Sequence, residues 1–203
     1  MSGAVSTLCA QAQLSEPPGW ETFYTIARQW GERMDLTSAR DDDTWAELLF
    51  LDAAEMIKAG LVVGGGSLVD VGAGVGAPTI PLLLADETLS ATLVEPRRKR
   101  ATFLRSAIGA LELTSRARVL EERIDPNQPA VDGAPFDLAL SRATFSPTEW
   151  MRIGLALAAH VVVFTAGKVP DFDQTGALVA RTDYAVPSTG APRSIFVSGD
   201  HAP

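Results

Sequence analysis

Three glycines that follow a buried acid are the residues of this chain best suited to chemistry at a ligand. Residues 67–76 read SLVDVGAGVG, so Asp70 lies between apolar residues and Gly72, Gly74 and Gly76 come next. Because glycine has no Cβ, the backbone N–H groups of such a turn can approach a bound molecule closely. Strand alternation points Asp70 away from its two valine neighbours. This pattern is typical of the nucleotide-binding turn of a doubly wound α/β domain.

The spacing of the glycines fits two classes of cofactor. Gly72, Gly74 and Ala77 satisfy G-x-G-x-x-G/A, the fingerprint of NAD enzymes. Gly72, Gly74 and Gly76, with Asp70 ahead of them, also match the D-x-G-x-G-x-G turn of methyltransferases that use S-adenosylmethionine (SAM). The turn alone therefore leaves both a SAM enzyme and an NAD oxidoreductase open.

A second acid supports a nucleoside ligand. The apolar run at residues 91–95 ends in Glu95, which lies 23 residues after Gly72. A carboxylate at this position accepts hydrogen bonds from ribose hydroxyls in both classes. Glu95 therefore predicts a bound nucleoside without deciding which one.

Alternating helical and extended patterns place these residues in an α/β domain. Helical spacing predicts helices at residues 21–33, 43–59, 78–85, 97–111 and 147–158, and apolar runs predict strands at 67–71, 91–95, 118–120, 136–140 and 161–165. We expect one domain over residues 1–203, with a helical part (1–66) that Gly64-Gly65-Gly66 closes and an α/β core (67–203).

The last part of the core discriminates between the two cofactors. Two β-rich runs, 179–186 and 193–197, flank the Pro- and Gly-containing segment 187–192 and predict an antiparallel hairpin. An NAD domain normally continues with another crossover unit, so this hairpin favours SAM.

Composition narrows the remaining classes. The 203 residues contain no apolar run long enough to span a membrane and no basic signal-peptide start. The single Cys9 excludes an internal disulfide, and a metal site is not expected with only His160 and His201 as histidines. We expect a cytoplasmic, metal-free monomer.

Positive charge is concentrated in one part of an acidic chain. The net charge is −8, whereas residues 91–142 carry nine basic and seven acidic side chains. Arg97, Arg98, Lys99 and Arg100 fall in the first turn of a predicted helix, where the helix dipole disfavours cations. They form either a solvated helix turn or a contact for phosphate. Because the chain is acidic overall, an RNA partner would have to be recognised by shape at this local patch.

Several segments in order resemble the ribosomal RNA small subunit methyltransferase G family, also called glucose-inhibited division protein B. Residues 30–41 (WGERMDLTSARD) resemble its W-N-x-x-x-N-L-T-s-x-R-D segment, and 51–54 (LDAA) stand where it has L-D-S-L. Residues 70–81 match its D-V-G-x-G-x-G-x-P-x-I-P turn, including Pro81. Later matches are Lys99-Arg100 with Phe103-Leu104, the triplet Ser141-Arg142-Ala143, and Val186-Pro187 with Arg193.

The resemblance implies a Rossmann-like SAM-dependent methyltransferase that methylates N7 of a guanine in 16S ribosomal RNA of the small subunit. Guanine N7 already carries an in-plane lone pair, so the reaction needs alignment but no general base. The implied cofactor-binding residues are Asp70, Gly72, Gly74, Gly76, Ala77, Glu95, Ile124, Asp125 and Arg142. Arg142 is also the implied catalytic residue, unless it only forms an ion pair with Asp137 or Asp70. The implied RNA-binding residues are Arg97, Arg98, Lys99, Arg100, Arg123 and Lys168.

The chain departs from the family pattern at two places. The family has Arg-His before L-D-S-L, where this chain has Leu48 and Leu49. The family's L-K-G corresponds to Thr165-Ala166-Gly167, and Lys168 is displaced by two positions. Both changes remove positive charge from the expected RNA face. A non-catalytic SAM-binding or regulatory protein therefore remains the alternative, with an NAD oxidoreductase third.

Overall fold

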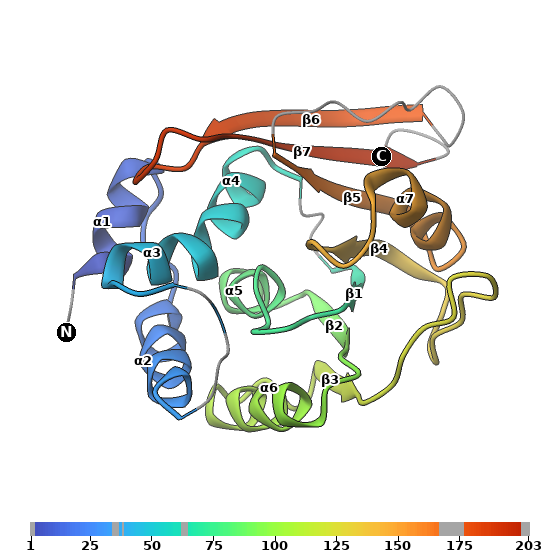
Figure 1. Cartoon of the computed structure of the whole chain (residues 1–203), viewed down its shortest axis with the longest axis horizontal. Helices are drawn as coiled ribbons and strands as arrows, with labels where there is room; N and C mark the ends of the chain where they lie inside the picture. The colour runs from blue at the N-terminus through green and yellow to red at the C-terminus, as the bar shows by residue number, and fades with distance from the viewer. Residues whose placement is uncertain (1–2, 34–36, 38, 62–64, 167–176, 200–203) are drawn as a thin grey trace.

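The described residues form a seven-stranded sheet with helices on both faces (Figure 1). The computed structural model describes residues 3–33, 37, 39–61, 65–166 and 177–199. The strand order is β3-β2-β1-β4-β5-β7-β6. The strands are β1 (Ser67–Val71), β2 (Ser90–Val94), β3 (Ala117–Leu120), β4 (Phe136–Ser141), β5 (Ala158–Thr165), β6 (Ala177–Ala185) and β7 (Pro192–Gly199).

Strand pairing across the sheet changes once from parallel to antiparallel, between β5 and β7. Strands β1 to β5 pair in parallel, and β7 pairs antiparallel with both β5 and β6. The predicted α/β fold with a terminal antiparallel hairpin is confirmed. The strand order reverses between β1 and β4, and in open α/β sheets ligands bind beyond the carboxyl ends of the strands at such a point.

Each face of the sheet has its own apolar core. Alternate residues of β1 separate: Leu68 belongs to one core cluster, and Val69 and Val71 belong to the other. The second face is covered by α7 (Pro147–Leu155). The first is covered by α1 (Ala4–Gln11), α2 (Trp20–Gly31), α3 (Asp42–Ala46), the π-helical turn η1 (Glu47–Leu51), α4 (Asp52–Lys58), α5 (Thr79–Ala85) and α6 (Arg98–Ala110).

The N-terminal helices are tied to the sheet by packing and by buried hydrogen bonds. The fully buried Trp20 stacks on Phe50 with ring centroids 4.7 Å apart, and its Nε1 donates to the Pro81 carbonyl at 3.0 Å. In the turn between β6 and β7, the backbone N–H and Oγ of Ser188 each donate to the carboxylate of Glu47 in η1 at 2.6 Å. The β6–β7 turn is thereby held against η1.

The structure differs from the sequence-based expectation in three elements. Helix α1 was not predicted, and the helix expected at 43–59 contains the π-helical turn η1 in its middle. Strand β5 begins at Ala158, three residues before the predicted start, because α7 already ends at Leu155. Gly64 lies outside the described residues. Among the helices that the structure describes, none is long and apolar enough to cross a membrane.

Replacing Trp20 by alanine should destabilise the protein by about 3–5 kcal/mol, because a large buried side chain and its hydrogen bond are lost. Urea unfolding measures this change. The matched control is Trp30→Ala in the same helix, where the side chain is only partly buried. Equal losses in the two variants would contradict a special anchoring role for Trp20.

Candidate functional site

The turn after β1 leaves its middle glycine open. The φ angles of Gly72, Gly74 and Gly76 are +79°, +57° and +78°, a region that favours glycine. A Cβ on Gly72 would lie 2.2 Å from Thr144 Oγ1, and one on Gly76 would lie 2.5 Å from Ile80 Cδ1. A Cβ on Gly74 would meet no described atom closer than 3.7 Å. Packing therefore requires two of the glycines, while Gly74 borders free space.

Asp70 is a buried carboxyl group at the end of β1. Its side chain points toward α5, as strand alternation predicts, and accepts a 2.7 Å hydrogen bond from Thr79 Oγ1. Burial raises the pKa of Asp70 to about 7, and the charge of Glu95 acts in the same direction, whereas the Thr79 bond and Arg142 lower it. This corner of the site therefore favours an additional positive charge.

Glu95 lies just beyond β2 and is also buried. Its Oε2 accepts from the Gly74 N–H at 2.9 Å, and its Oε1 accepts from the Arg97 N–H at 2.8 Å. The carboxylate thus joins the glycine turn to the start of α6. A carboxylate oxygen that accepts one backbone bond still has a lone pair for a ligand hydroxyl.

Ile124 and Asp125 follow β3 at the same edge of the sheet. Ile124 is buried in the cluster that contains Val71 and Val94. Asp125 is exposed, and its Oδ1 accepts from the Asn127 N–H at 2.9 Å. Their predicted contact with adenine stays a prediction.

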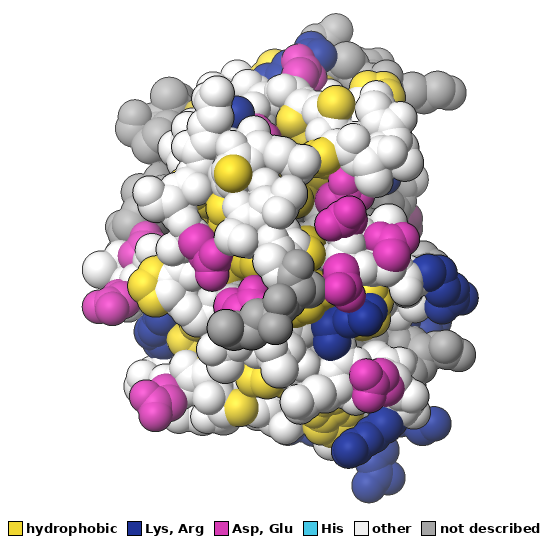
Figure 2. Space-filling view, turned by 90° about the vertical axis from the view of Figure 1, so that its left-hand side faces the viewer, with side chains coloured by type: hydrophobic (Ala, Val, Ile, Leu, Met, Phe, Trp, Pro, Cys, Tyr) yellow, Lys and Arg dark blue, Asp and Glu magenta, His cyan; other side chains and the backbone are white. Residues whose placement is uncertain are grey.

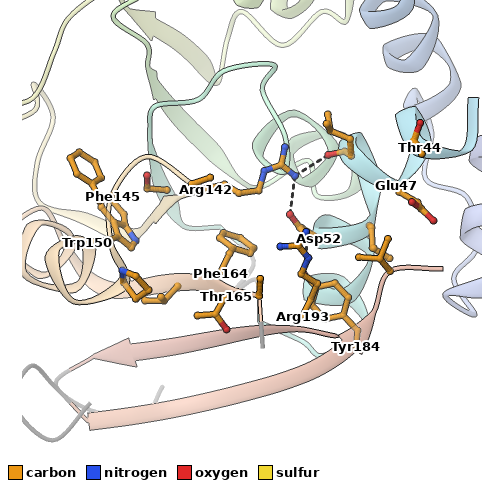
Figure 3. A pocket seen from close by; sticks show the side chains of 18 residues that line it. Thr44, Glu47, Asp52, Arg142, Phe145, Trp150, Phe164, Thr165, Tyr184 and Arg193 are labelled. Atoms are coloured by element: carbon orange, nitrogen blue, oxygen red, sulfur yellow. Dashed lines mark hydrogen bonds and ion pairs between the residues drawn. The ribbon is translucent and has the colours of Figure 1, made fainter. Parts of the chain in front are cut away.

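Arg142, directly after β4, is paired with a residue that the sequence reasoning did not assign to the site. Its Nη1 donates to Asp52 Oδ2 at 2.8 Å and to the Leu48 carbonyl at 2.9 Å (Figure 3). An ion pair with Asp70 or Asp137 is therefore wrong for this structure. Asp137 lies at the amino end of β4, where its carboxylate accepts from the N–H and Oγ of Ser67. The only signal for Asp52 was its place in the family's L-D-S-L motif.

A cavity of about 500 Å³ lies beside Arg142. Phe145 lies in one wall and stacks on Trp150, which is only 2% exposed, with ring centroids 5.9 Å apart and planes at 11° (Figure 3). Opposite them lie Asp52, Tyr184 and Arg193. The Tyr184 hydroxyl donates to Asp52 Oδ1 at 2.5 Å, and burial followed by the Asp52 charge raises the pKa of Tyr184. Aromatic rings and polar donors therefore face a common space.

The departures from the family pattern fall in different places. Leu48 and Ala166 both line this cavity. Leu49 is only 1% exposed and belongs to the apolar core, so the expectation that position 49 lies on an RNA face is wrong. The helix that carries both leucines turns successive side chains to different sides, which the sequence alignment alone did not separate.

The predicted RNA-binding residues are mostly at the surface. Arg97, Arg98, Lys99 and Arg123 are exposed. Arg100 is partly buried, and its Nη1 would lie 4.0 Å from a Cβ on Gly74, so it borders the glycine turn. Lys168 lies outside the described residues.

Charge is unevenly distributed on the side formed by the N-terminal helices. Figure 2 shows acidic side chains scattered across the middle of this face, most of the basic side chains toward its right-hand and lower parts, and a few basic side chains at the left and top. An approaching polyanion would therefore meet most of the positive charge toward the right-hand and lower parts of this face. No group of three metal-ligating side chains occurs among the described residues.

Most of the chain matches one known protein family. Residues 19–171 match the family described as rRNA small subunit methyltransferase G (GidB). This chain belongs to that family. It is a divergent member: it keeps the glycine turn, Asp70 and Glu95, but it has Leu48 and Ala166 in the cavity wall.

Curated relatives carry the family's name, and solved structures share the fold. The chain is 26% identical over 180 residues to ribosomal RNA small subunit methyltransferase G of Clostridium botulinum, covering 88% of this chain and 70% of that protein. It is 29% identical over 207 residues to the namesake of Syntrophus aciditrophicus, covering 94% and 83%. A putative methyltransferase from Escherichia coli shares the fold, with TM-score 0.57, 16% identity and coverage of 74% and 85%. So does a putative RNA methyltransferase from Pyrococcus horikoshii, with TM-score 0.55, 14% identity and coverage of 89% and 98%.

Titration of Asp70 should make stability depend on pH. The folded-state pKa of about 7 lies above the unfolded value of 3.8, so the folded protein binds more protons between these values. Stability should therefore fall as pH rises from 5 to 7 and level off above. Asp70→Asn, which can still accept from Thr79, should flatten this slope in urea unfolding measured at several pH values.

The matched control is Asp137→Asn. Hydrogen bonds from Ser67 lower the pKa of Asp137, so this carboxyl group titrates below the window. A pH slope that disappears in Asp137→Asn and persists in Asp70→Asn would overturn the assignment.

Proposed function

We propose that this protein transfers the methyl group of SAM to N7 of a guanine in 16S ribosomal RNA of the small subunit. The observation that carries the proposal is the open Gly74 turn between two buried carboxyl groups, next to an aromatic cavity that begins at Arg142. Membership of the family supports the reaction class. Small-subunit ribosomal RNA as the substrate comes from the relatives' names, and the particular base and atom come from the resemblance alone.

The described residues fit SAM. The Gly74 side of the turn leaves room for the backbone to contact the ligand, and Glu95 keeps lone pairs for ribose hydroxyls. Burial raises the pKa of Asp70, and a cation bound beside it would stabilise its carboxylate form. The bound cofactor supplies an electrophilic methyl group on a positively charged sulfur. Asp70, Gly72, Gly74, Gly76, Ala77, Glu95, Ile124 and Asp125 are the proposed binding residues.

The cavity beside Arg142 is the proposed place of the target base. Phe145, which is only partly buried and is backed by the buried ring of Trp150, offers aromatic surface on which a base turned out of its RNA helix can stack. Arg142 stands at the junction between this cavity and the glycine turn, where Thr144 packs against Gly72. Because N7 needs no deprotonation, these residues act by alignment and by excluding water.

The proposed RNA contacts are local. The exposed Arg97, Arg98 and Lys99 at the start of α6, with Arg123, would neutralise few phosphates. Lys168 keeps its predicted role without structural support. We infer that a small ribosomal subunit or its RNA is recognised by shape. Because that substrate is cytoplasmic, we propose that the reaction takes place in the cytoplasm.

The first test is cofactor choice. The purified protein should bind SAM or S-adenosylhomocysteine in calorimetry, and NAD should give no heat. Gly74→Leu should abolish binding, because its side chain would occupy the open space by the turn. Gly190→Leu is the matched control, since Gly190 also has a positive φ of +69° and open surroundings but lies in the hairpin turn. Binding of NAD without SAM would contradict the class.

The second test is methyl transfer. With SAM, the protein should methylate small ribosomal subunits or their RNA at guanine N7 but leave free guanosine unchanged, and mass spectrometry of the nucleosides detects the product. Transfer should fall with added salt, and about tenfold or more in a variant with Arg97, Arg98 and Lys99 changed to glutamine. Arg105→Gln is the control, because Arg105 lies on the same helix α6 but forms an ion pair with Glu121, just after β3. SAM binding without N7 methylation of any ribosomal RNA would favour the non-catalytic alternative.

A further inference from the structure

The continuous helix formed by α3, η1 and α4 changes its hydrogen-bonding pattern where it passes Arg142. The turn η1 (Glu47–Leu51) has π-helical i→i+5 bonding between two α-helical segments, a feature that is frequent at functional sites. Within it, the Leu48 carbonyl accepts from Arg142 Nη1 at 2.9 Å. Asp52 follows four residues later on the same side of the helix and accepts from the same nitrogen at 2.8 Å. One guanidinium nitrogen is thus held at two points.

Asp52 is itself held from the opposite side. Its second oxygen accepts from the Tyr184 hydroxyl of β6 at 2.5 Å, so both carboxylate oxygens are engaged. The side chains of Asp52 and Arg142 are 15% and 26% exposed, which reduces competition from water. Burial and the nearby Asp52 charge keep the pKa of Tyr184 raised, so this hydroxyl remains a donor. The carboxylate cannot rotate without breaking a contact.

The other guanidinium nitrogens of Arg142 are available to a substrate. No described residue accepts a hydrogen bond from its Nε or Nη2, and Arg142 lines the cavity. A planar guanidinium with one nitrogen fixed presents its remaining donors in a set direction. The ordering of this side chain is then complete before the RNA arrives.

We propose that Asp52 is a positioning residue for methyl transfer: with the Leu48 carbonyl and Tyr184 behind it, its carboxylate orients Arg142 toward the substrate base. This inference rests on the proposed function of the site. Asp52 does not touch the substrate in this scheme; it acts through Arg142. Residues from η1 and α4, β4 and β6 therefore cooperate, although they are separated by 90 and 132 positions along the chain.

Kinetics of single and double variants test the proposal. Asp52→Asn keeps the shape and one acceptor but removes the charge, so kcat for ribosomal methylation should fall about tenfold while SAM affinity changes less than about twofold. Arg142→Ala should likewise lower transfer more than SAM affinity. Because Asp52 acts through Arg142, adding Asp52→Asn to Arg142→Ala should cost no further activity. Tyr184→Phe should give a smaller loss in the same parameter.

The control is Asp42→Asn, which breaks the ion pair of Asp42 with Arg28 in the same group of N-terminal helices but away from the cavity. Its kcat should equal that of the wild type. Losses by Asp52→Asn and Arg142→Ala that multiply in the double variant would overturn the proposal. A lower melting temperature of Asp52→Asn with unchanged kcat would reduce Asp52 to a structural contact.

A readout that needs no catalysis separates this proposal from the proposed function. In nitrogen NMR, the Nη signals of Arg142 should be resolved and slowly exchanging in the wild type and in Asp42→Asn, and should merge in Asp52→Asn. Freely rotating Nη groups in the wild type would overturn the positioning role even if methylation occurs. Restrained Arg142 in a protein that methylates no ribosomal RNA would instead contradict the proposed function.

Discussion

Two carboxyl groups buried at the ends of neighbouring strands are the constraint on which the rest of the site depends. Burying an acid is unfavourable unless donors surround it. Thr79 donates to Asp70, and the backbone N–H groups of Gly74 and Arg97 donate to Glu95. These bonds couple β1, β2, α5 and the start of α6. The glycine turn keeps its shape because an acid on the next strand holds its middle amide.

The residual cost of that burial gives the site its chemical preference. Asp70 keeps a pKa of about 7, with Glu95 raising it and Arg142 lowering it. A cationic ligand in this corner would relieve the repulsion between the two acids. Ionisation of Asp70 lowers the stability of the ligand-free protein, because the charged carboxylate is buried. The same ionisation strengthens the attraction for a cation, so stability and cation binding should depend on pH in opposite directions.

The N-terminal helices contribute a wall of the site as well as a cover for the core. The turn η1 and Asp52 reach Arg142, while Glu47 anchors the hairpin turn through Ser188. The aromatic cavity therefore lies between three separate parts of the chain: the N-terminal helices, the ends of β4 and β5, and the hairpin. A change in any of the three would alter the space offered to a base.

Local pattern was enough to predict the elements that are strongly periodic. The sequence predicted every strand of the sheet, the terminal hairpin and the long helices, with boundaries displaced by a few residues. It missed α1, because eight residues of mixed small and apolar side chains carry little periodicity, and that helix is held by packing against α3. It also predicted one regular helix over residues 43–59, because helical spacing does not distinguish an α-turn from the π-turn η1, whose Leu48 carbonyl accepts a hydrogen bond from the distant Arg142.

For the site, sequence by itself determined the glycine turn, the two acids and the family. Those features are local: one strand, one turn and the next strand place them with little help from the rest of the chain. Only the tertiary structure decided that Arg142 pairs with Asp52 rather than with Asp70 or Asp137, that Tyr184 supports Asp52, and that Leu49 faces the core while Leu48 faces the cavity. The physical reason is distance along the chain: pairing between residues about a hundred positions apart depends on how helices pack against the sheet, which no local spacing records.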